Sequence, residues 1–92
     1  MLNDSLMNKS EITYVDYSYS FVANSTSNTS FYVNISKSGY VPISYSAACG
    51  YSTTTNLVWG VENFDNSKIG GYYVNKQSFN ISIRFRVAYI KI

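Results

Sequence analysis

The chain of 92 residues contains no histidine, one cysteine and one proline, and only 13% of its residues are charged. Histidine is the commonest metal ligand and a frequent general base, so its absence argues against zinc sites and catalytic triads. The single cysteine, Cys49, allows no internal disulfide, and its neighbours Ala47, Ala48 and Gly50 favour a small, buried structural thiol. We therefore expect no enzyme, no metal and no cofactor.

The few charges form no concentrated patch. The seven basic residues are scattered, and only Arg84 and Arg86 share a face, which is typical of the solvated side of a strand and not of a nucleic-acid-binding surface. The acidic residues supply one close pair, Glu62 and Asp65, which flanks a turn and suits solvated residues or polar ligand contacts better than catalysis. No apolar run approaches the roughly 18 residues that span a bilayer, so we predict no membrane insertion.

What the chain has in plenty is aromatic side chains and uncharged polar ones. Aromatic residues make up 17% of the sequence and hydrophobic residues 46%, while Asn, Ser and Thr provide most of the polarity. The length corresponds to about one domain, near the size at which a single core is only marginally stabilising. With no disulfide framework to add stability, such a composition indicates that further surface is buried against copies of the same chain. We expect an oligomer.

From Ile12 onward, apolar and polar residues alternate with the period of two that is typical of half-buried strands. The alternation predicts strands at about 12–21, 31–35, 40–51, 57–61, 72–74 and 79–89, separated by Ser/Thr/Asn or Gly turns. We expect the first two to form a hairpin around the polar turn 24–28, and Gly70 and Gly71 to give a flexible entry to the fifth. Six to seven such strands indicate an all-β, antiparallel β-sandwich or small barrel over residues 12–92.

Residues 1–11 are polar, with Leu2, Leu6 and Met7 at helix-compatible spacing, so we interpret them as a stub. The stub is either the end of a coiled-coil stalk or a disordered terminus.

The aromatic residues divide by the face on which the alternation places them. Tyr17, Tyr19, Phe31, Phe79 and Phe85 fall on apolar faces and are predicted to lie in the core. Others fall on polar phases or in loops, where a ring can stack on a sugar or a partner chain: Tyr32, Tyr51, Phe64, and Tyr72 or Tyr73. Trp59 suits core, subunit interface or ligand contact. With the polar turn after the fourth strand, the ligand-binding residues that we predict are Tyr51, Asn63, Phe64, Asp65, Asn66 and Tyr72.

Two segments carry a resemblance to a known family: Ser38-Gly39-Tyr40-Val41-Pro42-Ile43, and the terminal run from Ile81 to Lys91. Over about residues 29–92 the sequence resembles the carboxy-terminal domains of phage tail proteins from Gram-positive hosts. The resemblance implies a trimeric β-sandwich at the tip of a tail fibre or baseplate protein, located in the virion and recognising saccharide on the bacterial surface. No ligand motif of the family carries over residue by residue.

The leading hypothesis is therefore a receptor-binding tip, in which Asn63, Asp65 and Asn66 bind sugar hydroxyls and an aromatic ring offers an apolar face. A second hypothesis is a structural trimerisation or adaptor module that contacts other tail proteins but no receptor. A third is a bacterial adhesin or carbohydrate-binding module.

Overall fold

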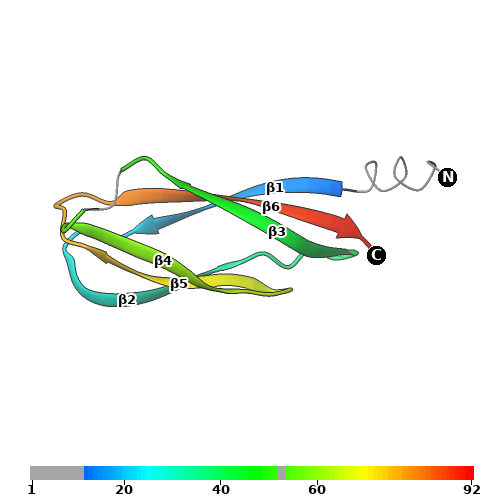
Figure 1. Cartoon of the computed structure of the whole chain (residues 1–92), viewed down its shortest axis with the longest axis horizontal. Helices are drawn as coiled ribbons and strands as arrows, with labels where there is room; N and C mark the ends of the chain where they lie inside the picture. Colours follow the sequence, from blue (N-terminus) through cyan, green and yellow to red (C-terminus); the bar gives the residue numbers. More distant parts are fainter. Residues whose placement is uncertain (1–11, 52–53) are drawn as a thin grey trace.

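The computed structural model describes residues 12–51 and 54–92. These described residues form six strands and no helix. They are β1 (Ile12–Phe21), β2 (Ser25–Asn34), β3 (Tyr40–Cys49), β4 (Leu57–Phe64), β5 (Lys68–Asn75) and β6 (Ile81–Lys91). They form two antiparallel three-stranded sheets, β1-β6-β3 and β2-β5-β4, which lie one above the other (Figure 1). This confirms the predicted all-β antiparallel sandwich. The prediction for residues 1–11 falls outside the described residues.

The expected hairpin between the first two strands is wrong. β1 pairs with β6 along its whole length, from Ile12 opposite Ile90 to Phe21 opposite Ile81, whereas β2 pairs with β5. The link between β1 and β2 therefore crosses from one sheet to the other. Asn24 makes this sharp change of direction with a positive φ of 59°, a conformation that asparagine tolerates better than most residues.

Two strands begin earlier than the sequence suggests. The predicted polar turn 24–28 lies mostly within β2, because backbone hydrogen bonding between strands does not require apolar side chains. The pairing of β2 with β5 is irregular there, with a register shift between Ser25 and Thr29. Gly70 and Gly71 lie inside β5, not before it. A Cβ atom at Gly71 would lie 2.0 Å from the carbonyl oxygen of Gly60, so β4 and β5 approach too closely there for any side chain.

The core lies between the two sheets and is largely aromatic and branched aliphatic. Phe21 stacks on Tyr73 with ring centroids 4.4 Å apart, and Phe31 and Phe85 are buried as predicted. Burial of each such side chain stabilises the fold by about 1.5–3 kcal/mol. Tyr17, Tyr19, Trp59 and Cys49 are half-buried because they lie on the edge strands β1, β4 and β3.

One predicted core position is corrected. Phe79 is 42% exposed, because β6 starts only at Ile81 and leaves this ring in the preceding loop. The alternation of the predicted strand 40–51 is also interrupted, since Ile43 is 48% exposed where a β-bulge between Pro42 and Ser44 shifts the alternation by one residue.

Candidate functional site

The outer face of sheet β2-β5-β4 gathers two tyrosines, an asparagine and a lysine. Its rows follow from the strand register: Tyr32 lies opposite Gly70, which lies opposite Asn63 on the other side. In the next row Tyr72 lies between Ser30 and Gly60. Residues directly opposite one another project from the same face of a sheet. We call this surface, made by Tyr32, Asn63, Lys68 and Tyr72 around Gly60 and Gly70, the tyrosine face.

Glycines allow two of these side chains to lie close to the sheet. At Gly60 a Cβ atom would lie only 2.8 Å from a ring carbon of Tyr72, so the Tyr72 ring lies across the glycine. At Gly70 the nearest atom to a Cβ would be Nδ2 of Asn63, at 3.4 Å. The side chain of Tyr32, by contrast, is 68% exposed. The tyrosine face therefore presents one projecting ring beside a low surface that carries a second ring and an amide.

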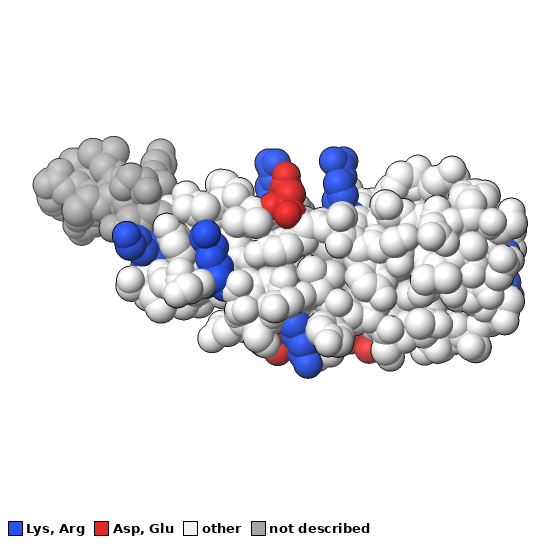
Figure 2. Space-filling view, turned by 180° about the vertical axis from the view of Figure 1, so that it is seen from behind, with Lys and Arg blue, Asp and Glu red and all other residues white. Residues whose placement is uncertain are grey.

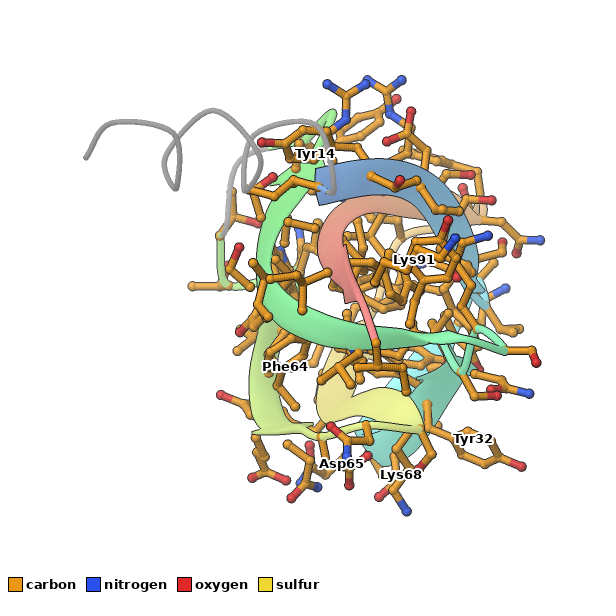
Figure 3. All side chains as sticks on the ribbon, turned by 90° about the vertical axis from the view of Figure 1, so that its right-hand side faces the viewer. Tyr14, Tyr32, Phe64, Asp65, Lys68 and Lys91 are labelled. Carbon is orange, nitrogen blue, oxygen red and sulfur yellow. The ribbon has the colours of Figure 1, made fainter. Side chains whose placement is uncertain are left out.

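The positive charge of this face lies next to the projecting ring. The Nζ atom of Lys68 lies 5.9 Å from the centroid of the Tyr32 ring, at the outer limit of a cation–π contact. Figure 3 shows Tyr32, Lys68 and Asp65 on one side of the molecule and Tyr14 on the opposite side. The tyrosine face and Tyr14 therefore lie on opposite outer surfaces of the sandwich (Figure 3).

The turn between β4 and β5 closes one end of the tyrosine face. Oδ1 of Asp65 accepts hydrogen bonds from the backbone N–H of Ser67 at 2.8 Å, the Ser67 hydroxyl at 3.0 Å and the backbone N–H of Lys68 at 2.9 Å. These bonds, the one from the Ser67 backbone first, lower the pKa of the Asp65 carboxyl below its ordinary value. One carboxylate oxygen of Asp65 is therefore committed to holding the turn, and exposed Asn66 lies within that turn.

Phe64 does not project toward a ligand. It faces the interior, half-buried, with its ring centroid 4.9 Å from that of Tyr45 on β3. It thereby joins the two sheets at the side where β3 and β4 run.

Tyr51 lies in the link between β3 and the start of β4, whereas the β4–β5 turn follows the end of β4, so the two lie at opposite ends of that strand. Its ring is 50% exposed and packs against that of Phe79, with centroids 5.5 Å apart. The loops at this end are joined by hydrogen bonds, since buried Asn75 donates to the carbonyl oxygens of Phe21 and Phe79. The pair Tyr51 and Phe79 forms a second, separate aromatic surface.

The structure thus brings two of the six predicted ligand-binding residues, Asn63 and Tyr72, onto one face, with Asp65 and Asn66 at its end. Of the two glycines that shape this face, Gly70 is predicted from the sequence to belong to a flexible entry, and Gly60 carries no prediction. A signal for their role was present, because glycine inside an alternating strand often marks a close approach. Among the described residues no group of three His, Cys, Asp or Glu side chains could hold a metal ion. No helix of the described part is long and apolar enough to span a membrane.

No protein-family model, no curated protein and no solved structure matches this chain.

Proposed function

We propose that the domain binds saccharide through the tyrosine face, as the receptor-binding tip domain of a phage tail fibre or baseplate protein. The observation that carries the proposal is the row Tyr32–Gly70–Asn63, with Tyr72 lying over Gly60 in the next row. An exposed ring offers an apolar surface to the C–H groups of a sugar, while an amide beside it donates to and accepts from hydroxyl groups.

The setting of these side chains supports the same function. They project from paired strands and not from a long loop, so their backbone is held in place before a ligand arrives and little backbone entropy is lost on binding. Their chemistry is mostly uncharged, which suits a neutral polyhydroxyl ligand. The phage tail as the place of action rests on the resemblance of residues 29–92, and binding to a bacterial surface is the function that this resemblance adds.

The test compares two exposed tyrosines on opposite faces. Tyr32 is 68% exposed on the tyrosine face and Tyr14 is 62% exposed on the outer face of sheet β1-β6-β3. We expect the chain to bind at least one polysaccharide purified from Gram-positive cell walls, as measured by titration calorimetry. Loss of the stacked ring in Tyr32→Ala should weaken binding by about 1–2 kcal/mol, which is roughly 5- to 30-fold. Tyr14→Ala should leave the affinity per chain unchanged.

Two outcomes contradict the proposal. If the chain binds none of a broad panel of cell-wall polysaccharides, the structural or adaptor hypothesis takes its place. If Tyr14→Ala weakens binding as much as Tyr32→Ala does, the ligand does not lie on the tyrosine face. Asn63→Ala provides a second probe of the same row, since Asn63 is exposed and its loss removes only the amide.

A further inference from the structure

Three of the four edge strands are interrupted, and one is not. The pairing of β2, β3 and β4 shifts register at Ser25/Thr29, Pro42/Ser44 and Val61/Asn63, respectively. Bulges and prolines of this kind are the usual means of preventing an edge from pairing with another chain. β1 instead pairs with β6 without a shift over all 10 of its residues, and it contains no proline.

The register shows which backbone groups of β1 point away from the sheet. The N–H of Ile92 donates to the carbonyl oxygen of Gly39 on the β3 side at 3.0 Å. Because bonded and non-bonded pairs alternate along an antiparallel ladder, the even-numbered residues of β6 bond toward β3 and the odd-numbered ones toward β1. Pro42 agrees, since it has no N–H to donate and lies opposite odd-numbered Tyr89.

It follows that the odd-numbered residues of β1 bond to β6, because each lies opposite an odd-numbered residue. The even-numbered residues from Ile12 to Ser20 direct their N–H and C=O groups outward. Within residues 12–51 and 54–92, no other group bonds to this outward row. β1 thus offers a straight, unpaired row of donors and acceptors.

We propose that this edge pairs, antiparallel and across a twofold axis, with β1 of a second copy of the chain. The two sheets β1-β6-β3 would then form one sheet of six strands. Bonded pairs must join even-numbered residues, and the register with Tyr17 on the axis places Asp16 opposite the partner's Ser18. The neighbouring register, with Asp16 on the axis, would set two carboxylates directly opposite each other, which is unfavourable.

Charge complementarity identifies a second copy as the occupant. On the outer face, Asp16 binds Arg86 through two contacts of 2.8 and 3.2 Å, whereas Arg84, opposite Ser18, has no ion-pair partner among the described residues. In the proposed dimer, the partner's Asp16 lies directly beyond Ser18 in the cross-strand row that begins at Arg84. The small Ser18 side chain leaves room for Arg84 to extend over it, so each Asp16 carboxylate receives one arginine from each copy.

Charged residues are sparse on this surface, so few other charges compete with this pairing (Figure 2). Figure 2 shows acidic and basic atoms side by side along the upper margin of the molecule, with mostly uncharged surface around them. A shallow depression of about 250 Å³ adjoins them and is lined by Asp16, Ser46, Ala48, Arg84, Phe85 and Arg86. The inner side of β1 fits the pairing too, because half-buried Val15 would lie opposite the partner's Tyr19 and the two Tyr17 rings would meet.

The test removes one outward N–H from each of two edges. Ser18→Pro deletes a donor from the free edge of β1 without removing a bond to β6. Ala47→Pro is the matched control, since Ala47 lies opposite odd-numbered Phe85 and so points its N–H to the free edge of β3. Light scattering coupled to size-exclusion chromatography of the full chain should give twice the mass of one chain for the unsubstituted protein and for Ala47→Pro. Ser18→Pro should give the mass of one chain.

A second variant guards against loss of folding. Arg84 is exposed, so Arg84→Glu leaves the core intact while it places a carboxylate beside the partner's Asp16. We expect the dimer dissociation constant to rise at least tenfold, with a circular dichroism spectrum unchanged. A monomer or a trimer for the unsubstituted chain at about 0.1 mM would overturn the proposal, as would a Ser18→Pro protein that stays dimeric. These outcomes do not bear on saccharide binding by the tyrosine face, but a dimer would contradict the trimer that the resemblance to phage tail domains implies.

Discussion

The hydroxyl groups of Tyr17 and Tyr89 meet inside the sandwich, and the Tyr89 hydroxyl donates in turn to the carbonyl oxygen of Ile35 at 2.6 Å. A phenol has a single hydrogen to donate, so Tyr17 is the donor in the bond to Tyr89. This chain of bonds connects β1, β6 and the residue that follows β2. These hydrogen bonds join the two sheets within a core that is mostly apolar.

Tyr89→Phe should destabilise the fold by about 1–3 kcal/mol, because it leaves the carbonyl oxygen of buried Ile35 without its donor. Urea unfolding followed by Trp59 fluorescence measures the change. Tyr14→Phe, at an exposed position, should change the free energy of unfolding by less than about 0.5 kcal/mol. Equal effects of the two substitutions would show that the buried hydroxyl contributes nothing to stability.

Stability should fall as the pH rises above about 10. Burial, and after it the hydrogen bond from Tyr17, raises the pKa of Tyr89 well above its ordinary value of 10.0. The unfolded chain then releases a proton that the folded chain retains, so this stabilisation is complete below pH 10 and is lost above it. Free energies of unfolding between pH 8 and 11 should decline, and less steeply in Tyr89→Phe. An identical decline in both proteins would contradict the assignment.

Asp65 should make the fold sensitive to acid. Its lowered pKa means that the ionised form is favoured by folding, so its contribution is present above the ordinary value of 3.8 and is lost as the pH falls below it through the folded pKa. Asp65→Ala should be less stable than the parent at pH 6 and should lose less stability between pH 5 and 2. Asn66→Ala, at an exposed residue of the same turn that carries no titratable group, is the control and should keep the parent's pH dependence.

Two adjacent glycines should respond to alanine in opposite ways. At Gly71 the added Cβ would lie 2.0 Å from the carbonyl oxygen of Gly60, so Gly71→Ala must separate β4 from β5 and should cost more than about 3 kcal/mol or abolish folding. At Gly70 the nearest atom would be at 3.4 Å, so Gly70→Ala should fold with a change below about 1 kcal/mol. Thermal unfolding separates the two, and similar melting temperatures would contradict the close approach.

Much of the fold could be predicted because alternation reports which side chains face the core. Ile81, Ile83, Phe85 and Val87 follow the rule without exception, and all four are buried. Alternation does not report which strands are neighbours, since all the strands share it, and this is why the hairpin between β1 and β2 was expected. A bulge leaves no clear mark either: the shift after Pro42 exposes Ile43, although its sequence phase is that of a core residue.

The candidate site was predictable to the extent that its parts lie close together along the chain. Asn63 and Tyr72 come together because β4 and β5 are consecutive strands joined by a short turn. Tyr51 was grouped with them on chemistry alone, yet it follows β3 and so lies at the other end of the sandwich. Tyr32 joins the face from β2 through a pairing that nothing in the sequence specifies.

The pairing of Ile12 with Ile90 also determines when the protein can fold. Among the described strands, β1 is synthesised before all the others and its partner β6 after them, so the sheet β1-β6-β3 can form only once β6 has been made. β4 and β5 are consecutive strands, so their hairpin can form before the sheet β1-β6-β3 does. Contacts between such distant segments slow folding. Throughout that delay both edges of β1 stay unpaired, so newly made chains compete with β6 for the same strand, and the yield of folded protein should fall as the concentration of nascent chains rises.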